Sequence, residues 1–433
     1  MPTHFRPEEC YQPCQAECRF PGCLDPIQAV ADEHEFSEGG GVNPAVDLST
    51  TFTFMKAQDM QKTFMGEMVS EEGEMGSSLY SRYQNPTVEM LGRKLAALEG
   101  TEAAFPLASG MAAITCSLLQ IVKNFKAQGE DRNTILASRQ IYGGTFAFLH
   151  DLASQFGWKI RFFHPANPEE CKNLLDSNVA AIYAETLSNP LLRLANIPAL
   201  AEMAEDVGAK LVVDNTFTPL VIMPHRLGAH VVVHSLTKFI GGHSDHMGGV
   251  VCSSKEFKNQ LRDLHTGFAM LLGPTLNPFA AWSIAMHMES LAIRFAEESK
   301  RAMRFAQELK KRQVRVIYPG LPEHPDHTLF KKMRNCVKYG FGGILTVDLG
   351  DAQRADLFME MLQEKMFGLL AVSLGNIRTL MSPSARSTSS ELPEEEKARI
   401  GLTEGMVRLS IGCSGNEEFM VQRLHKVLDE LDL

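Results

Sequence analysis

The chain has 433 residues, a formal net charge of −10 at pH 7 and an apolar fraction of 44%. This length exceeds what one ordinary hydrophobic core supports, so two or three packed domains are expected. An acidic chain lacks the basic face that general nucleic-acid binding requires. The sequence contains no apolar run near the ~20 residues that span a bilayer, and no secretory signal is recognisable. We therefore expect no nucleic-acid partner, no membrane insertion and a cytoplasmic location.

The N-terminal part is predicted to be an irregular arm up to about residue 42, and residues 56–78 follow without a steady hydrophobic period. The arm contains a cluster of four cysteines, which are Cys10, Cys14, Cys18 and Cys23. Their spacing includes no CxxC pair, so it is a weak zinc signal and we predict no metal. Free thiols in an irregular tail are the simpler interpretation.

From about residue 95 to 255, short apolar runs alternate with helical patterns, which is typical of a parallel sheet covered on both faces. Three runs end in polar residues: 179–183 is followed by Glu185, 210–213 by Asp214, and 230–233 by His234 and Ser235. Ligands of open α/β sheets gather at the carboxyl ends of the strands. Three consecutive strand ends are therefore predicted to carry the chemistry.

Three other segments have clear local patterns. Pro198 and Gly208 fit the first turn and the C′ position of a helix between the first two runs. Residues 382–396 are rich in Ser, Pro and Glu and are predicted to be a loop. The apolar stripe from Met420 to Leu431 predicts a C-terminal helix that packs on the core.

Lys238 directly follows the third apolar run and is preceded by the hydroxyl residues Ser235 and Thr237. A lone lysine is usually a solvated surface charge. A lysine just past a buried strand can instead enter a pocket, lose hydration and acquire a lower pKa. Such an amine is a nucleophile that can form a Schiff base. The two hydroxyls can donate to an anion such as phosphate, and Gly241-Gly242 lets the backbone turn close to a ligand.

Asp214 ends the preceding strand, 24 residues before Lys238. A turn-forming aspartate is the simple interpretation. The more specific one is a carboxylate that keeps a pyridinium nitrogen protonated, as pyridoxal 5′-phosphate (PLP) requires when it acts as an electron sink. Gly110 and Met111 form a turn into a helix, whose backbone N–H groups can bind phosphate. Together these features predict PLP held by Lys238.

Several spaced motifs resemble those of the Cys/Met-metabolism, or trans-sulfuration, family of PLP enzymes, from about residue 43 onward. The motifs are Tyr80-Ser-Arg82-x-x-Asn85-Pro86-Thr87, Tyr142-Gly-Gly-Thr145, Glu185 with Ser188-Asn189-Pro190, Asp214-Asn-Thr, Ser235-x-Thr-Lys238, Val372-Ser373-Leu374-Gly375 and Val407-Arg408-Leu-Ser410. The resemblance implies an α/β fold, the PLP-dependent transferase fold of type I (aspartate-aminotransferase-like). It has a mostly parallel central sheet covered by helices and a smaller α+β C-terminal domain.

The resemblance also implies a division of the chain into three parts. Residues 1–84 would be the arm and a segment that wraps a neighbouring subunit, 85–290 the PLP-binding domain, and 291–433 the C-terminal domain. Tyr80 and Arg82 would reach the cofactor phosphate of that neighbour. A homotetramer, built as a dimer of dimers with shared active sites, is therefore expected.

The matched positions imply roles for individual residues. Lys238, Tyr142, Asp214 and Tyr80 would be catalytic: Lys238 holds the cofactor and moves protons, while Tyr142 stacks on its ring. The cofactor-binding residues would be Tyr80, Arg82, Gly110, Met111, Tyr142, Glu185, Asn189, Asp214, Ser235, Thr237 and Lys238. The partner would be a small-molecule substrate, an amino acid. The substrate-binding residues would be Val372, Ser373 and Arg408, whose guanidinium fork suits a carboxylate.

The implied reaction is a γ-elimination on methionine-like or other sulfur-containing amino acids, which yields a 2-oxo acid, ammonia and a thiol. The alternative is a γ-replacement transferase of the O-acylhomoserine sulfhydrylase or cystathionine γ-synthase type. A non-catalytic PLP-binding protein is the third possibility. Lys238 and Asp214 serve both reactions, so they do not select between them.

Selection between these reactions is predicted to depend on positions around the common core. The apolar Val372 resembles the methionine γ-lyase pattern, whereas Gly144 departs from it because those enzymes typically have Cys there. The stretch 273–281 is closer to acylhomoserine sulfhydrylases. We also predict that Arg386 approaches an anionic tail of the substrate, with an ordinary exposed loop arginine as the alternative.

Overall fold

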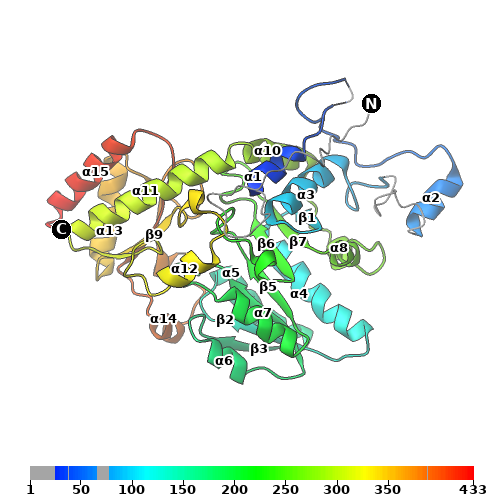
Figure 1. Cartoon of the computed structure of the whole chain (residues 1–433), viewed down its shortest axis with the longest axis horizontal. Coiled ribbons are helices and arrows are strands. Elements are labelled where there is room, and N and C mark those ends of the chain that lie inside the picture. The colour runs from blue at the N-terminus through cyan, green and yellow to red at the C-terminus, as the bar shows by residue number, and fades with distance from the viewer. Residues whose placement is uncertain (1–24, 38, 66–77, 388) are drawn as a thin grey trace.

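The computed structural model describes residues 25–37, 39–65, 78–387 and 389–433. The four clustered cysteines lie outside these residues, as do residues 66–77 of the predicted segment 56–78. Figure 1 shows a large α/β body and, at one end of it, a smaller group of strands and helices that the long helix α11 (Leu291–Lys311) enters. Among the described residues, no helix is both long enough and apolar enough to cross a bilayer.

Within the described ranges, seven strands form the central sheet in the order β1-β7-β6-β5-β4-β2-β3. Strand β7 is antiparallel to β1 and β6, and the other pairs are parallel, which confirms the mostly parallel sheet expected from the sequence. The strands are Ala103–Leu107 (β1), Thr134–Ser138 (β2), Lys159–Phe163 (β3), Val179–Glu185 (β4), Lys210–Asp214 (β5), Val231–Ser235 (β6) and Gly249–Ser253 (β7).

Apolar side chains cover both faces of this sheet. On strand β5, Leu211 and Val213 belong to one buried cluster and Val212 belongs to the other, because alternate side chains of a strand point to opposite faces. Helices α3 (Pro86–Glu99), α7 (Ile197–Asp206) and α10 (Pro278–Met288) pack into the first cluster, and α4 (Gly110–Ala127) into the second. Burial on both faces explains why the strands read as continuous apolar runs.

Shorter helices surround this core, and a further sheet follows it. The shorter helices are α1 (Pro26–Asp32), α2 (Ala57–Phe64), α5 (Gly143–Ala147), α6 (Pro168–Asn173), α8 (Lys255–Leu261) and α9 (Phe268–Leu272). In the described C-terminal residues, five strands have the order β10-β11-β12-β9-β8. They are Arg315–Ile317 (β8), Ile344–Asp348 (β9), Leu369–Leu370 (β10), Leu380–Pro383 (β11) and Met406–Ser410 (β12).

A third buried cluster joins the C-terminal sheet to α11 and two further helices. The helices of this part, besides α11, are α12 (His327–Met333), α13 (Ala352–Glu364), α14 (Glu394–Ile400) and α15 (Glu417–Glu430). Helix α15 corresponds to the helix predicted from the C-terminal stripe, with Leu424 and Val427 fully buried. The proposed domain boundary near residue 290 falls in the short connection between α10 and α11.

Two local predictions were wrong. The arm is not irregular throughout, because Pro26–Asp32 form helix α1, capped by Asp25, with Val30 buried in the first cluster. The predicted loop 382–396 begins inside β11 and ends inside α14. Helix α1, strand β11 and helix α14 are all short. Because their formation depends on packing against distant segments, they leave little periodic signal in the sequence. Helix α7 was predicted correctly, with Gly208 just past its end at φ +68°.

Candidate active site

A cavity of about 440 Å³ lies at the carboxyl ends of β4, β5 and β6, where the sequence predicted the chemistry. The segment before β11 and strand β12 of the C-terminal sheet close its other side. The cavity therefore lies between the two sheets. The predicted residues that line it are Gly110, Met111, Tyr142, Glu185, Asn189, Asp214, Ser235, Thr237, Lys238, Val372, Ser373 and Arg408.

Lys238 extends into this cavity from the turn that follows β6. Its Nζ donates a hydrogen bond of 2.7 Å to Ser373 Oγ. Burial, together with the positive charge of Arg408, lowers the pKa of Lys238 from 10.5 to about 8. The turn is tight: a Cβ at Gly241 would lie 2.6 Å from the Leu236 carbonyl oxygen. The amine is therefore held in place and is closer to its neutral, nucleophilic form than an exposed lysine is.

Arg408 is 2% exposed and lies opposite Lys238. Its Nη1 donates to Asn189 Oδ1 at 3.0 Å, and its Nη2 donates to the Ser373 carbonyl at 2.8 Å. Among the described residues its buried Nε has no partner. Burial lowers the pKa of Arg408 to about 10, so the guanidinium stays charged at neutral pH. A charged group with a free buried donor suits a carboxylate ligand.

Ser373 connects these two cations. It has a φ of +97°, a region that residues other than glycine rarely adopt. In this conformation its hydroxyl accepts from Lys238 and its carbonyl accepts from Arg408. Strained backbone of this kind persists where the surroundings enforce it, often at functional sites.

Two carboxylates face each other across the β4–β5 pairing, where Glu185 is opposite Asp214. Asp214 accepts the backbone N–H of Thr216 at 2.9 Å, and Glu185 accepts that of Tyr142 at 2.5 Å. Loss of hydration and mutual repulsion raise the pKa of Glu185, and loss of hydration raises the pKa of Asp214. A cationic group bound between these carboxylates would offset both their loss of hydration and their mutual repulsion.

The ring of Tyr142 is 43% exposed and lies against Gly144. A Cβ at Gly144 would lie 2.6 Å from Tyr142 Cε1, so any larger residue there must displace the ring. Partial burial, and then the negative charge of Glu391, raise the pKa of Tyr142. Gly144 therefore sets the position of the aromatic ring at the mouth of the cavity.

The first turn of helix α4 forms another wall. Ser109 caps the helix, and its Oγ accepts the N–H of Ala112 at 3.1 Å. Within the described residues, the N–H groups of Gly110 and Met111 have no protein acceptor. A Cβ at Gly110 would lie 2.9 Å from Ser235 Cβ, so only glycine lets the two segments approach so closely. Free backbone donors at a helix N-terminus bind phosphate well.

Tyr80 and Arg82 do not line the cavity of their own chain. Tyr80 is 44% exposed. The Arg82 guanidinium donates to the Met270 carbonyl at 2.7 Å and lies 4.4 Å from the ring centroid of Tyr83. Their predicted contact with the cofactor would have to be made in a second subunit.

The prediction for Arg386 was wrong. Arg386 does not line the cavity and instead forms a two-pronged ion pair with Asp356 of helix α13, at 2.5 and 3.0 Å. Its neighbours Ser387 and Glu391 do line the cavity. Asp356 is 30 residues away in the sequence, so only the tertiary structure shows that it forms an ion pair with this arginine.

Several further residues, for which no role was predicted from the sequence, complete the cavity wall. These are Ser109, Ile114, Leu187, Thr216, Phe217, Met247, Leu374, Ser387 and Glu391. Most are apolar or lie in loops with no motif of their own. Thr216 had a signal, because it follows Asp214 by two residues. Across the described residues, no group of three or more His, Cys, Asp or Glu side chains is arranged to hold a metal ion.

These residues fit PLP. The buried carboxylate of Asp214 suits a protonated ring nitrogen, and the free donors of Gly110 and Met111, with Ser235 and Thr237, suit the phosphate. Lys238 carries the amine for the cofactor aldehyde, and Tyr142 presents a ring face. The unpaired Nε of Arg408 remains for a substrate carboxylate.

Comparisons with known proteins agree with this fit. A sequence model of the family described as Cys/Met metabolism PLP-dependent enzyme matches residues 27–425. The chain is 41% identical over 398 residues to methionine gamma-lyase of Arabidopsis thaliana, covering 91% of this chain and 88% of the relative. It is 33% identical over 371 residues to O-succinylhomoserine sulfhydrylase of Pseudomonas aeruginosa, covering 85% and 86%.

A solved structure shows the same fold. The putative O-acetylhomoserine (thiol)-lyase of Campylobacter jejuni, which carries N′-pyridoxyl-lysine-5′-monophosphate, has a TM-score of 0.82 to this chain. The two are 26% identical, and the alignment covers 94% of this chain and 100% of the other. The expected type I fold, the PLP cofactor and the enzyme class, a carbon–sulfur lyase or related γ-replacement enzyme, are thereby confirmed. The chain belongs to the Cys/Met-metabolism family of PLP-dependent enzymes.

Proposed function

We propose that this enzyme is a γ-elimination lyase that converts methionine-like or other sulfur-containing amino acids into a 2-oxo acid, ammonia and a thiol. The observation that carries the proposal is the composition of the cavity that contains Lys238 and Arg408. Its lining includes the apolar side chains of Val372, Met247 and Ile114, which match a thioether side chain. The similarity to methionine gamma-lyase of Arabidopsis thaliana supports the same choice.

The proposed roles follow from the geometry. When bound, PLP withdraws electrons from the substrate Cα through its protonated ring nitrogen. Arg408 would bind the substrate carboxylate, which directs the Cα–H toward Lys238. Lys238, released from Ser373 and partly neutral near pH 8, would remove protons from Cα and then Cβ. Tyr142 would donate a proton to the departing thiolate, and Asp214 would balance the charge of the ring nitrogen.

The experiment that tests the proposal is a 2-oxo acid assay with the PLP-loaded enzyme and methionine, homocysteine and cystathionine. We expect 2-oxobutanoate, ammonia and a thiol in equal amounts from at least one of them. Sulfide-dependent consumption of O-acetylhomoserine without 2-oxo acid formation would instead assign a γ-replacement transferase. A PLP-loaded protein that is inert toward the whole panel would assign a non-catalytic role.

Glu391 supports a second candidate substrate. Its carboxylate lines the cavity near Tyr142, where it could pair with the distal ammonium group of cystathionine. The matched test is Glu391→Gln. If cystathionine is the substrate, its KM should rise while the kinetics with methionine, which has no distal charge, stay unchanged.

Our proposal includes a homotetramer with shared sites, which leads to a complementation prediction. Arg82→Ala and Lys238→Ala should each be inactive, whereas a mixture refolded or exchanged together should regain about a quarter of the wild-type activity. Half of the random pairs are hybrids, and each hybrid contains one intact site of two. Activity of the mixture equal to the sum of the two variants would show that each chain completes its own site. Mass measurement in solution would check the tetramer.

The lowered pKa of Lys238 leads to a pH prediction. A lysine with a pKa of about 8 is protonated below that pH and neutral above it, and only the neutral amine attacks an aldehyde. The rate of PLP uptake by the apo protein should therefore rise about tenfold per pH unit below pH 8 and level off above it. Stopped-flow absorbance measures this rate. Arg408→Gln removes a neighbouring positive charge and should move the midpoint upward, and an unmoved midpoint would contradict this explanation.

A cytoplasmic location is part of the same proposal. Its support is that Cys116, Cys171, Cys252 and Cys413, all among the described residues, form no disulfide bond. Free buried thiols are common in reducing compartments. Fractionation of cells that express the tagged chain tests the location.

A further inference from the structure

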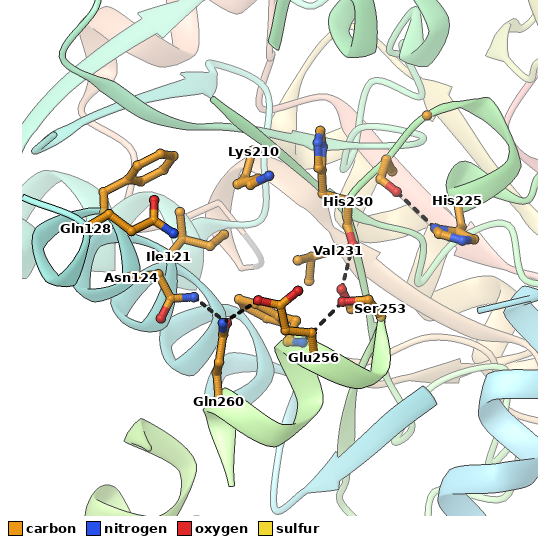
Figure 2. A pocket seen from close by; sticks show the side chains of 15 residues that line it. Ile121, Asn124, Gln128, Lys210, His225, His230, Val231, Ser253, Glu256 and Gln260 are labelled. Carbon is orange, nitrogen blue, oxygen red and sulfur yellow. Dashed lines mark hydrogen bonds between the residues drawn. The ribbon is translucent and has the colours of Figure 1, made fainter. Parts of the chain in front are cut away.

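Figure 2 shows a second cavity, which has a volume of about 430 Å³. It lies at the opposite end of the parallel strands from the cofactor cavity. It lies where β5 and β6 begin and β7 ends, between the last turns of α4 and the first turns of α8. Its lining residues are Ile121, Asn124, Phe125, Gln128, Lys210, His225, Gly228, Ala229, His230, Val231, Ser253, Ser254, Glu256, Phe257 and Gln260. Its volume is in the range of small-molecule sites, roughly 300–1,000 Å³.

This cavity is separate from the active site. Strand β5 begins with Lys210 in the second cavity and ends with Asp214 in the first, about 13 Å away along the strand at ~3.3 Å per residue. The two cavities share no lining residue. The roles proposed for the active site therefore leave the second cavity unexplained.

Charged groups of both signs enter it from different elements (Figure 2). The ammonium group of Lys210 is exposed, and among the described residues it has no hydrogen-bond or ion-pair partner. Glu256, in the first turn of α8, accepts a hydrogen bond of 3.1 Å from Gln260 Nε2. Gln260 in turn accepts one of 2.6 Å from Asn124 Nδ2, which holds this amide in place.

Hydrogen bonds determine what His230 offers to a ligand. His230 Nδ1 accepts the backbone N–H of Leu211 at 3.1 Å, so its proton is on Nε2, which is left as a donor. Burial and the charge of Lys210 lower the pKa of His230 to about 4, which keeps the ring neutral at pH 7. His225 donates from Nδ1 to the Ala229 carbonyl at 3.1 Å. The ring of His230 therefore offers one hydrogen-bond donor to a ligand.

The rest of the lining contains the apolar side chains of Ile121, Phe125, Val231 and Phe257, together with Gln128, Ser253 and Ser254. The two serine hydroxyls are already bonded to the backbone, Ser253 to the His230 carbonyl and Ser254 to the Phe257 N–H. A phosphate or dicarboxylate would be repelled by Glu256, and a polyamine would be repelled by Lys210. A ligand with one carboxylate, one ammonium group and an apolar body complements both charges and the apolar side chains. This combination is that of an amino acid with an aliphatic side chain.

We propose that this cavity is a second binding site, specific for a zwitterionic amino acid with an apolar side chain. Lys210 and His230 Nε2–H bind the carboxylate, and Glu256 binds the ammonium group. Ile121, Phe125 and Phe257 contact the side chain. The site binds its ligand without chemical change and independently of the reaction at Lys238.

The test uses the PLP-loaded enzyme after borohydride reduction, which attaches the cofactor permanently to Lys238 and prevents reaction with amino acids. Isothermal titration with L-leucine is expected to show one saturable site per chain. Lys210→Gln and Glu256→Gln should each weaken leucine binding at least tenfold. Two partial ligands, 4-methylpentanoate without the ammonium group and 3-methylbutylamine without the carboxylate, should also bind at least tenfold more weakly than leucine.

Matched controls come from the same chain. Lys159, which begins β3, and Glu169, in the first turn of α6, are exposed and do not line the cavity. Lys159→Gln and Glu169→Gln should bind leucine like the wild type. Absence of saturable leucine binding to the reduced wild-type enzyme overturns the proposal, even if every variant fails to fold. Equal affinity in folded Lys210→Gln and Glu256→Gln also overturns it.

Discussion

Lys238→Ala is expected to lower kcat at least ~1,000-fold with whichever sulfur amino acid the enzyme accepts, because it removes both the covalent anchor of PLP and the proposed base. The variant should also lose the visible absorption of the lysine-bound cofactor. No other described lysine lines the cavity, so no neighbouring amine replaces it. Steady-state 2-oxo acid formation and absorption spectra of the reconstituted protein measure the two effects.

Lys159→Ala is the matched control for this prediction, since that lysine is exposed at the start of β3. It should keep wild-type activity and the wild-type spectrum. If Lys238→Ala retained a tenth of the activity after PLP addition, Lys238 would be neither the anchor nor the base.

Arg408→Lys is expected to lower kcat/KM about 100-fold. This factor corresponds to a loss of about 2.8 kcal/mol in the free energy of transition-state binding. A lysine cannot reproduce the fork that now donates to Asn189 and Ser373 while leaving Nε free. The substrate carboxylate would lose its partner, so most of the change should appear in KM. The spectrum of the lysine-bound cofactor should change little, because Lys238 stays in place.

The proposed role of Arg408, binding of the substrate carboxylate, is tested by comparing ligands with and without that carboxylate. The wild type should bind an amino acid much more tightly than the amine that lacks only its carboxylate. Arg408→Lys should lose most of this preference, as measured by competitive inhibition. A variant with lower activity but unchanged preference would show that Arg408 supports the fold and does not bind the carboxylate, and thermal unfolding would then reveal lower stability.

Local sequence signals predicted the chemically reactive part of this protein. Asp214 and Lys238 follow apolar strands directly, so their positions at strand ends could be inferred without knowing the sheet order. The same reasoning placed Gly110 at the start of a helix. These inferences succeeded because each depends on a few adjacent residues and on the shared edge of parallel strands.

Residues whose roles depend on distant partners were predicted less well. Arg386 was expected at the substrate and instead pairs with Asp356, while Glu391, with no motif around it, lines the cavity. Helix α1 was missed because its seven residues are too few for a clear period and are stabilised by packing on the core. The second cavity also had no signal, since Lys210, His230 and Glu256 come from three separate elements.

The sequence by itself determined the cofactor, the family and the residues of the common chemistry, because these are encoded in short motifs whose order along the chain is specific. Only the tertiary structure decided how the C-terminal sheet brings Ser373 and Arg408 to Lys238, which carboxylate lies at the mouth of the cavity, and that a second cavity exists. Those features result from contacts between segments far apart in the chain, and such contacts follow from packing in three dimensions.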